Sequence, residues 1–226
     1  MELKGKVVVI TGALGTLGKA VAEAAAYLGA TVIAVDRVEG AKLAGVQVAP
    51  ALDLGNSQAT RDAFASLANK HGRIDALVNV AGGFSWETLA DGSIETWDRL
   101  YQMNIRTAVN ACQAALPHFP KSGGRIVNIG AAGAVKAAAG MGAYAASKSG
   151  IARLTEALAE ELKAGDTTVN AVLPSIIDTP VNRADMPDAD YSRWVTPQAL
   201  ADVIVFLLSD RARAITGALI PVTGRV

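Results

Sequence analysis

The feature that most constrains the fold is an alternation of short β-branched runs with longer segments rich in alanine and leucine. The short runs are apolar on both faces, which is typical of strands in a parallel sheet covered by helices on both sides. Helices between successive strands supply the crossover connections that parallel strands need. The expected strands span residues 7–11, 31–36, 46–53, 75–82, 125–130 and 168–174, with a last strand within 216–224, and the expected helices span 16–28, 57–70, 93–119, 144–163 and 197–208.

This order of elements predicts one α/β domain over residues 1–226, with a doubly wound parallel sheet flanked by helices on both faces. A chain of 226 residues is of ordinary length for a single domain. Residues 178–196 break the alternation, because they are rich in proline and aspartate but also carry Tyr191 and Trp194. We expect this segment to be a short mobile flap over a substrate site.

The composition of the chain indicates which kinds of molecule it binds. The 21 Lys and Arg residues balance the 21 Asp and Glu residues, so no overall field attracts nucleic acid or an anionic membrane. The single Cys112 cannot form an internal disulfide, and the apolar run at 7–11 is too short for a signal peptide. We therefore expect a cytoplasmic protein with a small-molecule substrate and no metal. Its 51% hydrophobic content suggests that some apolar surface is buried between the subunits of a homodimer or homotetramer.

The first expected strand runs into TGALGTLG at 11–18, which has glycines at positions 12, 15 and 18. Such glycines permit a tight turn and close approach of the backbone to a pyrophosphate at the start of a helix. Asp36 lies 18 residues after Gly18, at the end of the second strand. A carboxylate there accepts hydrogen bonds from ribose hydroxyls and repels a 2′-phosphate, which favours NAD(H). Arg37, the next residue, could instead meet a 2′-phosphate, so NADP(H) stays open.

Several further motifs follow in an order that resembles the short-chain dehydrogenase/reductase family over essentially the whole chain. Asp53-Leu54 is similar to the family's acidic-aliphatic pair that contacts adenine, residues 79–82 to its Asn-Asn-Ala-Gly segment, and residues 174–180 to its turn beside the nicotinamide. Two positions depart from the family pattern: Thr16 replaces the middle glycine of the loop, and Val80 the second asparagine.

The resemblance implies a Rossmann fold, oxidoreductase activity and a bound nicotinamide dinucleotide. It also implies which residues bind that cofactor. They are Gly12, Leu14, Gly15, Thr16, Leu17, Gly18, Asp36, Arg37, Asp53, Leu54, Asn79, Ala81, Gly82, Tyr144, Lys148, Pro174, Ile177 and Thr179.

Tyr144 and Lys148 match the catalytic pair of the family, and Asn104 matches its helix asparagine. Hydride transfer to a carbonyl or imine is helped by a positioned proton donor. By resemblance, Tyr144 would exchange the proton, and Asn104 would hold a water on the proton path. Lys148 would bind ribose hydroxyls and lower the pKa of Tyr144 from its usual value of about 10.

Ala131 occupies the position of the family's catalytic serine, thirteen residues before the tyrosine. Losing a donor to the substrate oxygen slows a reaction that depends on it by a factor of about 100 to 1000, but it leaves the proton donor in place. Either the enzyme is impaired on alcohols and ketones, or its substrate needs no such bond. The dihydropteridine reductase branch has alanine here, and residues 80–84, Gly140-Met141 and Asp36 resemble that branch, whereas Asn104 resembles the main family.

Three functions follow from these motifs. The first is an NADH-preferring oxidoreductase acting on a carbonyl or conjugated imine, the second is an enzyme like quinonoid dihydropteridine reductase, and the third is a non-catalytic NAD-binding sensor. We expect a substrate pocket with aromatic walls, which suit a flat or apolar acceptor. Its expected residues are Phe84, Trp86, Met141, Tyr191 and Trp194, of which Trp86 and Trp194 could equally serve to pack the flap.

Overall fold

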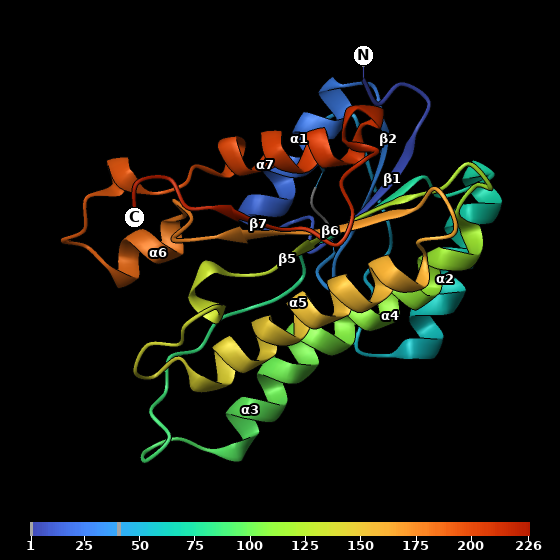
Figure 1. Ribbon diagram of the computed structural model, residues 1–226. Coiled ribbons are helices and arrows are strands. Elements are labelled where there is room, and N and C mark those ends of the chain that lie inside the picture. The colour runs from blue at the N-terminus through green and yellow to red at the C-terminus, as the bar shows by residue number, and fades with distance from the viewer. Residues whose placement is uncertain (1, 40–41) are drawn as a thin grey trace.

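The computed structural model describes residues 2–39 and 42–226, and its centre is a parallel sheet of seven strands (Figure 1). The strand order is β3-β2-β1-β4-β5-β6-β7, so the winding direction reverses between β1 and β4. Ligands of such sheets bind outside the carboxyl ends of the strands at this reversal. The strands are β1 (Val7–Thr11), β2 (Thr31–Val35), β3 (Val46–Val48), β4 (Ala76–Asn79), β5 (Arg125–Ile129), β6 (Thr168–Pro174) and β7 (Leu219–Val222).

Helices cover both faces of the sheet (Figure 1). On one face lie α1 (Thr16–Tyr27) and α7 (Pro197–Leu208), and on the other lie α2 (Ser57–His71), α4 (Thr107–Ala115) and α5 (Gly142–Glu161). Alternate residues of β1 belong to two separate apolar cores, Val8 and Ile10 to the first and Val7 and Val9 to the second. This explains why the strands are apolar on both faces, and it confirms the doubly wound fold predicted from the sequence.

The helix expected over residues 93–119 is divided into several parts. It begins as α3 (Ile94–Tyr101), widens into a π-helical turn at Gln102–Arg106, continues as α4 and ends in a 3-10 turn at Leu116–His118. A π-helical turn carries one residue more than an α-helical turn, and such turns are frequent at functional sites. Here the wide turn contains the buried Asn104.

Two expected strands are shorter than the sequence pattern predicts. The strand expected over 46–53 ends at Val48, and the strand expected over 75–82 ends at Asn79. In both cases the chain leaves the sheet early, and the residues that follow form loops at the carboxyl edge. Those loops carry Asp53, Leu54, Ala81 and Gly82 to the site described below.

The flap at 178–196 has regular structure of its own. It contains α6 (Pro180–Asp185) and a 3-10 turn at Tyr191–Arg193, and Ile177 and Val195 form a single parallel bridge at its base. Two further 3-10 turns, Ala132–Ala134 and Asp210–Ala212, follow β5 and α7. Within residues 2–39 and 42–226, the helices are too short or too polar to cross a membrane.

Candidate active site

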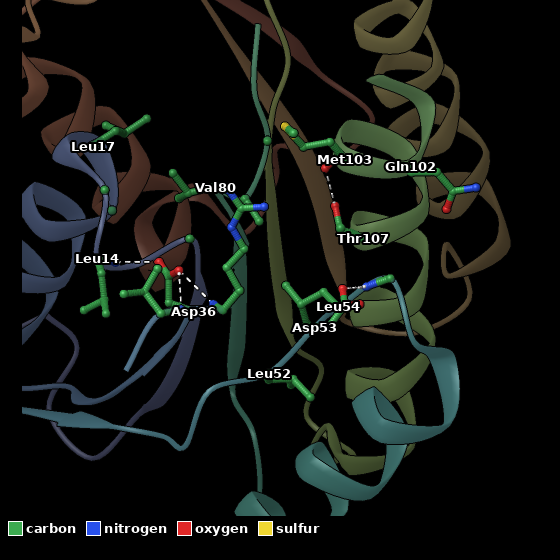
Figure 2. Close-up of a pocket in the computed structure, with 18 of the residues that line it drawn as sticks. Leu14, Leu17, Asp36, Leu52, Asp53, Leu54, Val80, Gln102, Met103 and Thr107 are labelled. Carbon is green, nitrogen blue, oxygen red and sulfur yellow. Dashed lines mark hydrogen bonds between the residues drawn. The ribbon is translucent and has the colours of Figure 1, made fainter. Parts of the chain in front are cut away.

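A cavity of about 1090 Å³ lies at the carboxyl ends of β1, β2 and β4, where the strand order reverses (Figure 2). The flap contributes Thr179 and Val181 to its wall, and the helix side contributes Gln102, Met103 and Thr107. Most residues expected to bind a dinucleotide line this cavity. They are Gly12, Leu14, Gly15, Thr16, Leu17, Gly18, Asp36, Arg37, Asp53, Leu54, Ala81, Gly82 and Thr179.

In the glycine loop, the structure explains why two of the three positions are occupied by glycine. Gly12 has a φ of +62°, and a Cβ there would lie 2.7 Å from the amide nitrogen of Ala81. A Cβ on Gly18 would overlap with the carbonyl oxygen of Gly12. Gly15 precedes α1 and has no side chain to cap it, so the first amides of that helix have no side-chain partner, and residues 15–18 line the cavity. Thr16 begins the helix, a position that requires no glycine. This cradle fits a pyrophosphate.

Asp36 joins the end of β2 to the glycine loop (Figure 2). Its Oδ2 accepts a hydrogen bond from the Leu14 amide at 3.0 Å, and its Oδ1 accepts from the amides of Arg37 at 2.8 Å and Val38 at 3.3 Å. The carboxylate therefore fixes the loop as well as facing the cavity. Arg37 lines the same cavity, so charges of both signs lie at this end.

The loop that carries Asp53 and Leu54 is held from the helix side by residues that sequence reasoning missed. Asn110 on α4 donates from Nδ2 to the carbonyl oxygen of Leu54 at 2.7 Å, and Arg106 donates from Nε to the carbonyl oxygen of Gly55 at 3.0 Å. The signal that could have found Asn110 is a polar residue in an otherwise apolar helical run. These bonds fix the loop against the far wall of the cavity.

Three expected catalytic residues, Tyr144, Lys148 and Asn104, come from two helices. Lys148 is buried on α5, one turn after Tyr144, and donates from Nζ to the carbonyl oxygen of Ile129 at 2.8 Å. Lys148 and Asn104 both approach Gly82, because a Cβ built there would lie 3.4 Å from the lysine Nζ and 2.6 Å from the asparagine Oδ1. Gly82 lines the cavity, and the two polar groups lie close behind it without lining the cavity themselves.

Asn104 is engaged by protein groups on both atoms of its amide. Its Oδ1 accepts from the Gly83 amide at 2.8 Å, and its Nδ2 donates to the Gly83 carbonyl oxygen at 3.1 Å and to Ser147 Oγ at 2.8 Å. Ser147 in turn donates to the carbonyl oxygen of Tyr144 at 2.8 Å. The expected role of holding a water is therefore joined by a structural role, since Asn104 links the Gly83 loop to α5.

Burial shifts the pKa values of both members of the Tyr-Lys pair. It raises the pKa of Tyr144 to about 12 and lowers the pKa of Lys148 to about 8, in each case because the charged form loses hydration. The direction for Tyr144 is opposite to the lowering by Lys148 that we expected. A tyrosine that stays neutral at pH 7 is suited to donate a proton.

The side chains expected to form the substrate wall fall into two groups. Phe84 contacts Tyr144 edge to face, with ring centroids 4.9 Å apart, and Met141 caps the start of α5. Trp86 donates from Nε1 to the carbonyl oxygen of Ala139 at 3.0 Å. Tyr191 and Trp194 instead pack on each other within the flap, with centroids 4.8 Å apart and Trp194 buried.

Three other expected cofactor residues have structural contacts in the described chain. Asn79 donates from Nδ2 to Asn128 Oδ1 at 2.8 Å within the core. Pro174 ends β6, and Ile177 forms the bridge to Val195 at the base of the flap. The serine position, Ala131, is only 5% exposed at the end of β5 and brings no hydroxyl to the site.

The family model, two sequence relatives and a solved structure that match this chain are all described as dehydrogenases or reductases. The family model described as short chain dehydrogenase matches residues 6–190. A 3-oxoacyl-[acyl-carrier-protein] reductase from Thermotoga maritima is 33% identical over 99% of this chain and 98% of that protein. A meso-2,3-butanediol dehydrogenase from Serratia marcescens is 33% identical over 99% and 95%. The solved structure of a short-chain type dehydrogenase/reductase from Mycobacterium ulcerans covers 100% of this chain and 90% of its own, with a TM-score of 0.91 at 27% identity.

Proposed function

Because the chain belongs to the short-chain dehydrogenase family and is thus an NAD(P)-dependent oxidoreductase, we propose that it moves hydride between NAD(H) and a carbonyl or conjugated imine. The observation that carries the proposal is that Lys148 and Asn104 both approach Gly82, which lines the cavity. Lys148 lies one helical turn after Tyr144. The non-catalytic sensor considered from the sequence is set aside, since family membership makes the chain an enzyme.

Each part of the dinucleotide is assigned to a different set of residues. The amides at the start of α1 would bind the pyrophosphate, Asp36 would bind the adenosine ribose, and Thr179 in the cavity wall and Lys148 behind Gly82 would hold the nicotinamide end. The nicotinamide supplies or accepts the hydride. Tyr144 donates or accepts the proton at the substrate heteroatom, and Lys148 stabilises the tyrosinate that forms.

The preference for NAD(H) over NADP(H) rests on Asp36, whose carboxylate faces the cavity and repels a 2′-phosphate. Arg37 lines the same end and reduces the margin of that preference. We therefore propose that the enzyme accepts both nucleotides with NAD(H) ahead. The ratio of kcat/KM with NADH to kcat/KM with NADPH measures this directly, and a ratio below one contradicts it.

The substrate class follows from Ala131. The relatives reported above are named for substrates as different as a 3-oxoacyl-[acyl-carrier-protein] and meso-2,3-butanediol, so their names do not fix the substrate of this chain. A nearly buried alanine offers no hydrogen bond to a substrate oxygen. This supports acceptors whose reactivity comes from conjugation, and a quinonoid dihydropterin is the specific alternative that Ala131 favours.

The test is consumption of NADH with quinonoid dihydropterin and a panel of ketones, diketones and quinones, for the wild type and for Tyr144→Phe. Loss of the proton donor should lower kcat by about 100- to 10,000-fold on the accepted substrate while the Kd for NADH stays within about two-fold. Tyr27→Phe, at the exposed end of α1, is the matched control. Equal turnover in Tyr144→Phe would remove the proposed mechanism.

We further propose that the protein is a cytoplasmic homodimer or homotetramer. Ile94, Trp97 and Tyr101 are exposed on α3, at spacings of three and four residues, so they form one apolar stripe on its outer face. Exposed apolar stripes of this kind are typical of surfaces that another protein covers. The balanced charge and the single cysteine favour the cytoplasm.

A further inference from the structure

Two loops of the carboxyl edge are fastened together at Trp86. The indole Nε1 donates to the carbonyl oxygen of Ala139 at 3.0 Å, and the amide of Glu87 donates to the carbonyl oxygen of Gly140 at 2.8 Å. Gly140 has a φ of +73°, and a Cβ there would overlap with the indole ring. We call this arrangement of Trp86, Glu87, Ala139 and Gly140 the Trp86 strap.

Both sides of the strap lead to Tyr144. On one side, Phe84 precedes Trp86 by two residues and contacts the ring of Tyr144 at a centroid distance of 4.9 Å. On the other side, Met141 follows Gly140, and its carbonyl oxygen accepts a hydrogen bond from the Ala145 amide at 2.7 Å at the start of α5. The strap therefore sets the separation between Phe84 and the helix turn that carries Tyr144.

The strap contributes little to the hydrophobic core. Trp86 is 61% exposed, and it packs on a glycine that offers no side chain. A tryptophan whose indole nitrogen is bonded to a loop carbonyl, and whose ring covers a positive-φ glycine, fixes loop geometry more than it buries apolar area. Its removal should therefore leave the fold intact and change the shape of the site.

We propose that Trp86 is a positioning residue, which acts through Gly140 and Met141 to fix Tyr144 against the bound substrate where Ala131 provides no hydroxyl to do so. This inference rests on the proposed function, because Tyr144 must be the proton donor for its position to matter. It also assigns a reason for glycine at position 140, where any other residue would displace the indole.

The kinetic test uses three single variants and the best acceptor found for the wild type. Trp86→Ala should lower kcat/KM by about 10- to 100-fold, mostly through kcat, and leave the Kd for NADH unchanged. Trp86→Phe keeps a ring over Gly140 but loses the indole N–H, so its loss should be about five-fold. Leu89→Ala, an exposed position in the same loop, is the control that should retain full activity.

Gly140→Ala completes a double-mutant cycle that separates positioning from independent damage. In the wild-type background the added methyl group should lower kcat/KM by about 10-fold or more, because it displaces the indole. In the Trp86→Ala background the overlap is gone and only the backbone strain of alanine at a φ of +73° remains, so the same substitution should cost about three-fold or less. Additive effects would overturn the proposal, as would wild-type kcat in Trp86→Ala.

A readout that needs no turnover keeps this proposal distinct from the proposed function. The chain has three tryptophans, so 5-fluorotryptophan labelling gives three fluorine resonances, and Trp86→Phe assigns one of them. In Gly140→Ala that resonance should shift and sharpen, while the resonances of Trp97 and Trp194 stay in place. An unmoved Trp86 resonance would show that no strap exists, whereas a wild type without turnover on any acceptor would refute the proposed function alone.

Discussion

At the scale of single residues, the proposed substrate class depends on Ala131. Ala131→Ser would place a hydroxyl two residues after β5, at the position that by resemblance matches the family's serine. We expect kcat/KM on simple ketones to rise by about 10-fold or more, because a new donor stabilises negative charge on the substrate oxygen. Steady-state kinetics on ketones and on a conjugated imine measure the effect.

The control for this substitution is Ala146→Ser, which adds the same hydroxyl to an exposed position of α5. It should leave activity on every acceptor unchanged. If Ala131→Ser gains nothing on ketones, the absent hydroxyl is not what limits that chemistry, and the substrate class inferred from Ala131 loses its support.

Lys148 connects the catalytic site to the pH dependence of stability. Burial lowers its pKa from 10.5 to about 8, so between these values the unfolded chain binds more protons than the folded one and stability rises with pH. Relative to Lys148→Met, the free energy of unfolding of the wild type should rise by about 2 kcal/mol between pH 7 and pH 9.5. Urea denaturation of both proteins at the two pH values measures this difference.

The pH range and a control variant together assign this change in stability to Lys148. The raised pKa of Tyr144 acts with the opposite sign, since stability is lost as tyrosinate forms, but only above a pH of about 10. Lys163→Met removes an exposed lysine of a surface ion pair and should show no such pH trend. A flat difference between wild type and Lys148→Met would mean that Lys148 keeps its ordinary pKa.

A single residue type is predictable from the sequence where backbone geometry permits no other. Gly12 and Gly18 are predictable because a Cβ at either position has no room. The pKa of Tyr144 was not predictable in the same way, since spacing on a helix shows that Lys148 is near but not how deeply both groups are buried. Ser147, which bonds Asn104, carries no sequence signal that separates it from an ordinary helix serine.

At the scale of elements, the flap shows how a loop-like sequence can fold. The Arg183 guanidinium forms two bonds to the Asp178 carboxylate, which keep the pKa of that carboxyl below its usual range, and it also lies 4.8 Å from the centre of the Tyr191 ring. Thr179 and Val181, which line the cavity, lie between the paired residues in the chain. The ion pair therefore helps to hold one cavity wall.

Arg183→Ala should loosen this wall, because it removes both the ion pair and the contact with Tyr191. We expect the Kd for NADH to rise by about three-fold and limited proteolysis between residues 178 and 196 to accelerate. Arg153→Ala, which breaks an exposed ion pair with Glu156 on α5, is the matched control and should change neither. Unchanged affinity in Arg183→Ala would show that the flap wall is held by its other contacts.

Hydropathy predicts the strands and most helices because burial on both faces leaves a clear pattern, as in residues 168–174, where the expected and observed strands coincide. It does not predict the π-helical turn at Gln102–Arg106, since one extra residue in a helix has no hydropathy signature. Asn104, a polar residue buried in that turn, is the only local sign. The sequence likewise predicts a mobile flap, because residues 178–196 show no apolar periodicity. The structured part of the flap instead contains the ion pair between Asp178 and Arg183, which hydropathy does not reveal.

At the scale of the whole molecule, the exposed stripe on α3 predicts assembly. Tyr101 and Tyr27 are each the last residue of a helix, and they are 55% and 82% exposed, but only Tyr101 belongs to the stripe with Ile94 and Trp97. Tyr101→Asp should shift the molar mass measured by light scattering toward a single 23.2 kDa chain, because it puts charge into an apolar interface. Tyr27→Asp should leave the mass unchanged, and a wild type that is already monomeric contradicts the prediction.

The π-helical turn uncouples the direction of α3 from the number of residues in the helix. A π-helical turn holds about one residue more than an α-helical turn, so an in-frame deletion of one codon within 102–106 would restore regular winding and leave α3 and α4 in nearly the same relative orientation. Such a deletion would keep the direction of the stripe of Ile94, Trp97 and Tyr101 but remove the wide turn that holds Asn104 against Gly83. A single mutational event at this turn would therefore disturb the candidate active site and spare the surface proposed for assembly.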